Sequence, residues 1–162
     1  MRKRVLAAAA IASAFSIAMT SASFAQAPPP DYGAPINAEQ ARVAAAAAIA
    51  EMKKNGWKMA VTVVEPSGAL VHFERVDGTQ YASLTIAQKK AQAAATFKRP
   101  TKAFQDGLAK GNTYLMTLTG VIASEGGIPV IVGGKIIGAV GCSGGTGAQD
   151  GQACAAGVAA VK

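Results

Sequence analysis

The chain has 162 residues, of which 51% are hydrophobic and 6% aromatic, and 16 Lys and Arg residues against 9 Asp and Glu give it a formal net charge of +7. This length is that of one domain, and the apolar content excludes a disordered tail. With 18 glycines and 2 cysteines, the chain is neither a collagen-like repeat nor a scaffold held by many disulfides.

Residues 1–25 have the three-part layout of a secretory signal peptide. Residues 2–4 are basic, residues 5–19 form an uncharged apolar run, and the small residues Ser23 and Ala25 stand at the −3 and −1 positions of a cleavage site. A membrane anchor is the alternative, but the run has only 15 residues, and a membrane-crossing helix needs about 20. We therefore expect cleavage and a periplasmic or secreted protein without a membrane anchor.

Cleavage would leave 137 residues with a formal charge of +4. The remaining Lys and Arg residues are scattered through the chain. No zinc-finger, basic-helix or aromatic-interleaved strand pattern accompanies them. The charge therefore does not indicate a nucleic-acid partner.

Residues 26–38 are predicted to be a proline-rich linker, because four prolines and a glycine in its first ten residues prevent it from continuing a helix or a sheet. A single domain would then occupy residues 39–162. Asn37 is a suitable N-cap, with Gln40 three residues on, for an alanine-rich helix that ends near Lys54.

The middle of the chain predicts a hairpin followed by helix. The β-rich runs 59–65 and 69–76 are joined by a Pro-Ser-Gly turn. A second alanine-rich helix is expected over 83–97, ending before Pro100, and a short amphipathic helix over 101–110.

The last third predicts a second hairpin and a final helix. Residues 114–124 are ambiguous between strand and loop. Strands are expected over 128–132 and 135–141, because the two glycines between them suit a hairpin turn. The glycine-rich segment 142–147 leads into a helix from about 149 to 161. The pattern indicates an α+β domain with an antiparallel sheet.

Several kinds of site are missing from the sequence. One histidine cannot form a two-histidine metal site within one chain, and no nucleophile elbow, Walker loop or dinucleotide fingerprint is present. Cys142 and Cys154 lack the spacing of metal or covalent heme sites. In an oxidising compartment they are expected to form a disulfide, with two buried free thiols as the alternative. No residue is assigned a catalytic role.

The strongest local signal is the glycine-rich segment 141–150. Glycines before a helix N-terminus expose backbone N–H groups, and the helix dipole adds positive charge, so an anion could bind there. The alternative is a tight turn whose N-cap, Thr146 or Asp150, occupies those donors. Arg75, Lys90, Lys98 and Arg99 are the cations that could complete an anion site.

Spaced motifs along the domain resemble those of the GlcG/HbpS family. The resemblance covers about residues 39–162 and is specific to the family, though not to a ligand. The motifs are Val-Val-Glu-Pro-Ser-Gly-Ala-Leu (63–70), Arg-Val-Asp-Gly (75–78), Ala-Gln-Lys-Lys-Ala (87–91), Phe-Lys-Arg-Pro-Thr (97–101), Gly-Gly-Ile-Pro-Val (126–130) and Ile-Gly-Ala-Val-Gly-Cys-Ser-Gly-Gly (137–145).

The resemblance implies a profilin-like α/β/α sandwich, with an antiparallel sheet of about five strands and helices on both faces. It also implies a homo-oligomer, commonly an octamer. Exported members of the family bind heme and take part in heme and redox sensing, so a sensor kinase is a candidate partner. The glycolate-operon members have no settled activity.

The family motifs imply a set of ligand-contacting residues without catalytic roles. For a heme iron, His72 is the first candidate ligand, with Tyr81, Tyr114 and the weak thioether of Met52 as others. The ligand-binding candidates are Arg75, Lys90, Arg99, Gly126, Gly127, Ser143, Gly144 and Gly145.

Three functions are compatible with the sequence. The first is an exported, non-enzymatic binding protein for heme or a related anionic tetrapyrrole. The second is a small enzyme or accessory protein acting on a 2-hydroxy-acid-type carboxylate, with acid and base groups among Glu65, Glu74, Asp77 and His72. The third is a structural or signalling partner that binds no small molecule.

Overall fold

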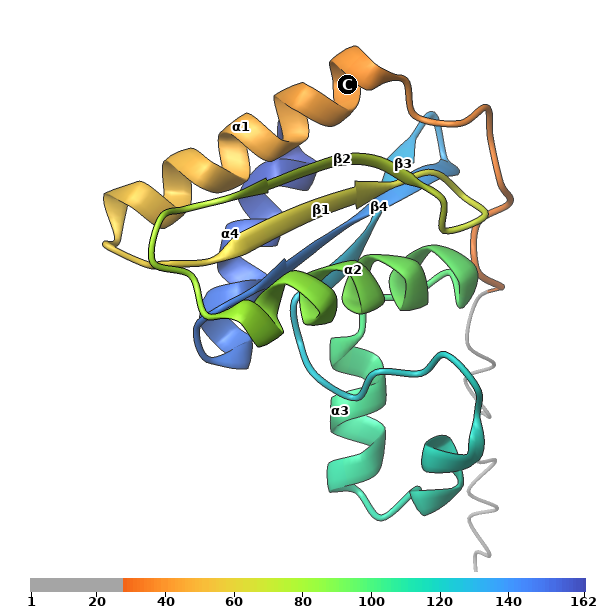
Figure 1. Ribbon diagram of the computed structural model, residues 1–162. Coiled ribbons are helices and arrows are strands. Elements are labelled where there is room, and N and C mark those ends of the chain that lie inside the picture. Colours follow the sequence, from red (N-terminus) through yellow and green to blue (C-terminus); the bar gives the residue numbers. More distant parts are fainter. Residues whose placement is uncertain (1–27) are drawn as a thin grey trace, which may run out of the picture.

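The computed structural model describes residues 28–162, and the predicted signal peptide lies outside that range. Its centre is an antiparallel sheet of four strands in the order β2-β1-β4-β3 (Figure 1). Both predicted hairpins are present, since β1 pairs with β2 and β3 pairs with β4. The strands are β1 (Ala60–Val64), β2 (Leu70–Arg75), β3 (Gly127–Val132) and β4 (Lys135–Ser143).

Helices cover both faces of the sheet, which confirms the predicted α+β sandwich. α1 (Ala38–Lys54) and α4 (Gly147–Ala159) lie on one face, and α2 (Tyr81–Thr96) packs on the other (Figure 1). The larger apolar cluster lies under α1 and α4, and a smaller one of alanines and valine lies under α2. None of the helices in residues 28–162 is long and apolar enough to cross a membrane.

The described residues form four strands where about five were expected. Residues 114–124, the ambiguous segment, form a loop that begins with the 3-10 turn η1 (Thr113–Thr117). Gly111 and Gly120 flank this turn with φ angles of +88° and +86°. Such left-handed residues interrupt an extended strand, so the segment adds nothing to the sheet.

The helix starts follow their capping residues. Asn37 Oδ1 accepts the Gln40 N–H at 2.9 Å, and the Gln40 side chain accepts the Asn37 N–H at 3.2 Å, which confirms the predicted cap of α1. α4 begins two residues before the expected position because Thr146 is its N-cap. α2 likewise begins at Tyr81 rather than at residue 83.

Residues 31–36 of the predicted linker are attached to the sandwich. Gly33 N–H donates to the Ile136 carbonyl at 2.8 Å, and Ile36 N–H donates to the Ile137 carbonyl at 2.7 Å. The Tyr32 hydroxyl donates to the Ala95 carbonyl at 3.0 Å. This segment forms no strand of the four-stranded sheet, but these bonds and an isolated parallel bridge between Tyr32 and Ile136 attach it to β4. Its prolines lie beside, and not at, the residues whose amides form these bonds.

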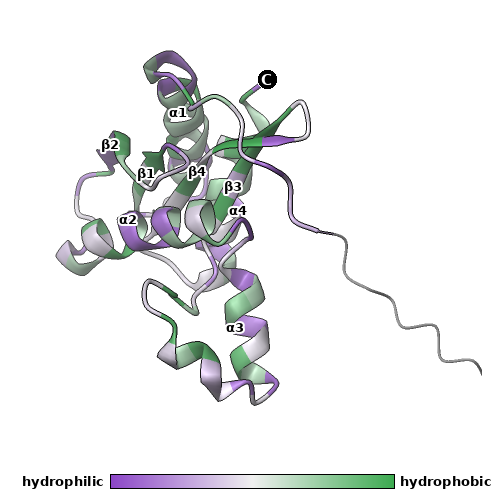
Figure 2. Ribbon diagram, turned by 90° about the vertical axis from the view of Figure 1, so that its right-hand side faces the viewer, coloured by the Kyte–Doolittle hydropathy of each residue, from purple (hydrophilic) through white to green (hydrophobic). Residues whose placement is uncertain are grey.

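An arm of residues 102–125 projects from the sandwich (Figures 1 and 2). It consists of α3 (Lys102–Ala109), the η1 turn and the loop that returns to β3. Phe104 and Leu115 are its buried apolar side chains. The Phe104 ring packs edge-on against Phe97 at a centroid distance of 5.3 Å, which anchors the base of the arm.

Candidate functional site

The fold brings motifs from distant parts of the sequence to one end of the sheet. Arg75, at the end of β2, and Ser143, at the end of β4, both pair with Ala60. Gly127 of β3 pairs with Gly141 of β4 beside them. This end of the sheet is therefore where the glycine-rich turn, the buried part of α2 and the start of α4 meet.

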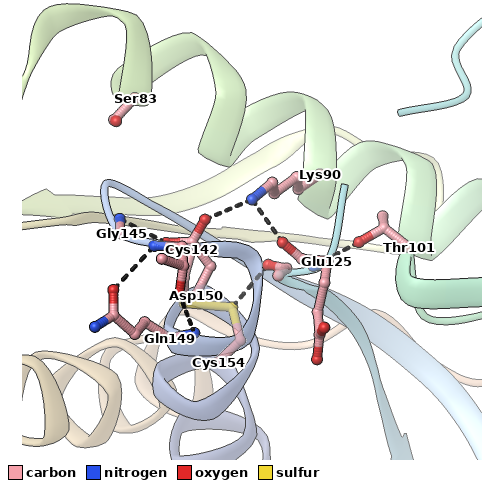
Figure 3. Close-up of polar contacts among 12 residues, drawn as sticks. Ser83, Lys90, Thr101, Glu125, Cys142, Gly145, Gln149, Asp150 and Cys154 are labelled. Atoms are coloured by element: carbon pink, nitrogen blue, oxygen red, sulfur yellow. Dashed lines mark hydrogen bonds and ion pairs between the residues drawn. A yellow bond between two sulfur atoms is a disulfide. The ribbon is translucent and has the colours of Figure 1, made fainter. Parts of the chain in front are cut away.

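Side chains of α4 and its N-cap occupy several of the backbone donors in the glycine-rich turn. Gly145 N–H donates to Asp150 Oδ1 at 3.0 Å, Thr146 N–H to Gln149 Oε1 at 2.9 Å, and Gln149 N–H to Thr146 Oγ1 at 3.3 Å (Figure 3). The structure thus has the capped tight turn of the alternative, and the Asp150 carboxylate occupies the Gly145 N–H that an anion at this turn would use.

Close packing explains why glycine occupies several of these positions. A Cβ on Gly127 would collide with the Lys90 carbonyl, and one on Gly141 would collide with the Ala87 carbonyl. Both contacts come from the backbone of α2, which lies directly on the paired β3 and β4 strands. At Gly144, a Cβ would lie 2.5 Å from the Lys58 carbonyl. These glycines serve the packing of α2 and of the turn.

Lys90 was predicted to contact a ligand, but it forms an internal ion pair with Asp150 instead. Its side chain is 1% exposed, and its ammonium nitrogen lies 2.7 Å from Asp150 Oδ2 and 2.6 Å from the Glu125 carbonyl oxygen (Figure 3). Burial raises the pKa of the Asp150 carboxyl above its usual range, against the opposing effect of the hydrogen bonds from Lys90 and Gly145. The pair joins α2, the loop before β3 and α4.

Gly126 and Gly127 line a hollow of about 420 Å³ next to this ion pair, which we call the glycine hollow. Its wall is mainly apolar, with Lys102 and Glu125 as its charged members. Lys102 is hydrogen-bonded to Asp106 at 2.8 Å, which raises the pKa of the Lys102 ammonium. The lining is completed by Pro100, Ile128, Ala148, Gly151, Gln152 and Ala155.

A larger hollow of about 680 Å³ lies on the outer side of α2, between that helix and the base of the arm; we call it the α2 hollow. Lys89 is its cation. Gln92 Nε2 donates to the Gly68 carbonyl at 3.3 Å across one wall. Its lining residues are Ser67, Gly68, Lys89, Gln92, Ala93, Thr96, Gly120, Val121 and Ile122.

The other predicted residues are dispersed. Arg99 lines a third hollow with Lys98 and five prolines, and its Nε donates to the Phe97 carbonyl at 3.2 Å. His72 Nε2 lies 3.8 Å from Glu74 Oε2 on the edge strand β2, and neither His72 nor Arg75 lines any of the three hollows. Met52 is fully buried in the core, which removes it as an iron ligand.

The candidate acid and base groups of the enzyme hypothesis are also not gathered. The Glu65 carboxylate accepts the Ser67 N–H at 3.1 Å within the β1–β2 turn. Glu74 and Asp77 are exposed at β2 and in the turn after it. None of these groups lines the three hollows.

Cys142 and Cys154 form a disulfide in this structure. Their Cα atoms are 5.6 Å apart, and both side chains are fully buried. The bond joins β4 to α4 directly below the ion pair (Figure 3). The structure thus has the predicted disulfide and not the alternative of two free thiols.

The model of a protein family described as "Haem degrading protein HbpS-like" matches residues 36–159. The chain belongs to this family. Protein GlcG of Escherichia coli strain K12 is 37% identical to it over 108 residues, which are 67% of this chain and 81% of GlcG. The GlcG/HbpS resemblance predicted from the motifs is confirmed.

Solved structures of similar proteins have the same HbpS-like sandwich. Klebsiella pneumoniae protein ORFY matches with a TM-score of 0.75 at 27% identity, over 85% of this chain and 97% of that one. A double mutant of Streptomyces reticuli HbpS matches with a TM-score of 0.74 at 28% identity, over 93% and 99% of the two chains. A PduOC complex with heme, 23% identical with a TM-score of 0.72 over 79% and 96%, shares the fold.

Sequence reasoning on this HbpS-like chain missed Lys89 and Glu125. Lys89 follows the buried Ala87 by two residues and so lies on the outer side of α2, where it reaches the α2 hollow. The helical spacing of the buried residues could have revealed this. No sequence pattern indicated Glu125. Its backbone carbonyl accepts from Lys90 only because the loop before β3 places it there.

Proposed function

We propose that this HbpS-like chain is an exported binding protein for heme or a related anionic tetrapyrrole, which it stores or senses outside the cytoplasm. The observation that carries the proposal is the α2 hollow, which combines apolar surface with a single cation. The family description and the heme held by the similarly folded PduOC support this class of ligand. A homo-oligomer, up to an octamer, and a sensor-kinase partner belong to the same proposal.

The lining of the α2 hollow fits part of a heme. Ala93, Val121 and Ile122 offer apolar surface to the ring, and the Lys89 ammonium can bind a propionate carboxylate. A bound heme would supply an iron centre for redox or ligand sensing. No His, Cys, Met or Tyr is among the lining residues, so the hollow of one chain offers the iron no ligand of those types.

The alternative of an enzyme acting on a small carboxylate rests on the similarity to GlcG. A general acid or base must lie within hydrogen-bond reach of the reacting group. The candidate groups lie on the edge strand and in turns, and none of them lines a hollow, although the Glu65 carboxylate accepts the N–H of Ser67 at the rim of the α2 hollow. This placement favours binding over turnover.

Titration of the mature chain with hemin tests the proposal. We expect a saturable Soret shift with a defined stoichiometry. Lys89→Glu should weaken binding roughly tenfold, because a charge-assisted hydrogen bond is replaced by repulsion. Lys53→Glu, an equal charge change at an exposed position in the last turn of α1, is the matched control. Spectra identical to those of hemin with an unrelated protein, or equal weakening by both variants, would reject the proposal.

A further inference from the structure

The glycine hollow has an acidic side chain in its wall, that of Glu125, which is half-buried. Within residues 28–162, the hydrogen bonds of Glu125 all use its backbone. Its N–H donates to Gln105 Oε1 at 2.8 Å, and its carbonyl accepts from the Lys90 ammonium at 2.6 Å. The side chain extends away from Lys90 (Figure 3). The carboxylate is therefore left without a partner from the described part of the chain.

The position of this carboxylate is well defined. The two backbone bonds of Glu125 fix the root of its side chain. At the other end, a Cβ on Gly151 would lie 2.6 Å from Glu125 Oε1, so the carboxylate rests against the bare backbone of α4. Gly151 is itself part of the hollow's wall. A charged group that is already in place costs a ligand less to bind than one that must first be ordered.

The charged side chains around the hollow leave one negative charge in excess. Lys102 is the cation of the wall, but its ammonium already donates to both Asp106 carboxylate oxygens, at 2.8 and 3.0 Å. This pair is neutral as a unit, so the charge of Glu125 is not compensated. A partly buried carboxylate in an apolar setting is stabilised by an opposite charge. The hollow therefore favours a cation and disfavours an anion.

The rest of the wall indicates what kind of cation fits. A metal ion such as Ca²⁺ takes about six to eight oxygen ligands, and residues 28–162 contain no cluster of three or more His, Cys, Asp or Glu side chains that could hold one. Most of the wall is instead apolar, with Pro100, Ile128, Ala148 and Ala155 among its members. An organic cation with a hydrocarbon part matches both the carboxylate and these apolar side chains.

We propose that the glycine hollow is a second ligand site, which binds a small organic ammonium ion carrying a short hydrocarbon chain. The ammonium donates to the Glu125 carboxylate, and the chain packs on the apolar wall. Gln152 supplies a further acceptor, because its Nε2 donates to Glu51 Oε1 at 2.6 Å and its amide oxygen remains for the ligand. The volume of about 420 Å³ suits a small molecule. The site shares no lining residue with the α2 hollow and is independent of heme.

Titration of the isotope-labelled mature chain with butylammonium chloride at neutral pH, followed by NMR of the backbone amides, tests the site. We expect saturable shifts at Gly126, Gly127 and Gly151, which border the hollow. Glu125→Gln keeps both backbone bonds and should weaken binding at least tenfold, because a charge-assisted hydrogen bond is lost. Glu74→Gln is the matched control, since it removes the same charge at an exposed position on β2 outside the hollow.

Two further measurements separate the charge of the site from its shape. Butan-1-ol, which has the same chain without the charge, should bind the wild-type protein at least tenfold more weakly than butylammonium. This comparison does not depend on the folding of any variant. Gly151→Ala, which places a methyl group where the Glu125 carboxylate lies, should also weaken butylammonium binding, although alanine suits a helix better than glycine.

Three results would overturn the proposal. The first is an absence of saturable shifts with butylammonium. The second is equal weakening by Glu125→Gln and Glu74→Gln, with circular dichroism showing both variants folded. The third is equal binding of butan-1-ol and butylammonium, which would mean that the hollow recognises the hydrocarbon chain and not the ammonium.

Discussion

The ammonium nitrogen of Lys90 lies 2.7 Å from Asp150 Oδ2, with the two side chains 1% and 4% exposed. Lys90 comes from the middle of α2, and Asp150 from the first turn of α4 on the opposite side of the sheet. The contact lies at the end of the sheet where Gly127 of β3 pairs with Gly141 of β4. It therefore joins the two helical layers at the point where the family motifs converge.

Loss of the Lys90 cation should destabilise the chain strongly. Lys90→Met leaves the Asp150 carboxylate buried without its partner, and breaking such a pair costs about 3 kcal/mol or more. Lys89→Met, one residue away on the exposed side of α2, should change the free energy of unfolding by less than about 0.5 kcal/mol. Urea unfolding of both variants measures the difference. Equal effects would show that burial of Lys90 has little energetic consequence.

The pH dependence of stability should reveal the raised pKa of Asp150. Because the folded state binds a proton at this carboxyl at a higher pH than the unfolded state does, the wild-type chain gains stability as pH falls through the window between the raised pKa and the ordinary value of 3.8. Asp150→Asn has no such group, so it should become less stable relative to wild type across that window. Unfolding at a series of pH values measures this difference. The opposite trend would mean that the Lys90 contact outweighs burial.

Local signals in the sequence were sufficient for most of the fold. The capping residues Asn37 and Gln40, the Pro-Ser-Gly turn and the glycines between β3 and β4 each act through neighbouring residues, and the structure has a helix start or a hairpin at each. The attachment of Tyr32 and Gly33 to β4 was not predicted. It depends on a strand about 100 residues further along the chain, and local propensity carries no information about such pairing.

The candidate site was harder to predict because residue type does not reveal burial. Lys90 was predicted to contact a ligand, although it lies in helical register with the buried residues Ala87, Ala91 and Ala94. That spacing indicates a buried side chain, but lysine is usually exposed, and the sequence does not show that Asp150 lies opposite it. The motif glycines were predicted to expose backbone donors, whereas each of them has a close neighbour, which is the backbone of α2 at Gly127 and Gly141 and the Lys58 carbonyl at Gly144.

Two buried threonines should respond in opposite ways to the same substitution. Thr62 and Thr101 are both 0% exposed, but the Thr62 hydroxyl has no hydrogen-bond partner among the described residues, whereas Thr101 Oγ1 accepts the Gly127 N–H at 2.9 Å. Thr62→Val should be neutral or stabilise by up to about 1 kcal/mol, because it removes an unpaired polar group. Thr101→Val should cost about 1–2 kcal/mol, since it leaves the Gly127 N–H unpaired. Thermal and urea unfolding compare the two, and destabilisation of similar size in both would contradict the expectation.

The Cys142–Cys154 disulfide should contribute measurably to stability. The two residues are 12 apart in sequence, and closing a loop of about this size in the unfolded chain stabilises a protein by roughly 3 kcal/mol. Replacement of both cysteines by alanine should lower the free energy of unfolding by about that amount, and reduction of the wild-type chain should lower it similarly. Thiol titration of the unfolded, unreduced protein should detect no free thiol, because both cysteines of the chain are paired. Detection of two thiols, or a double variant as stable as the oxidised wild type, would count against the bond as a stabilising link between β4 and α4.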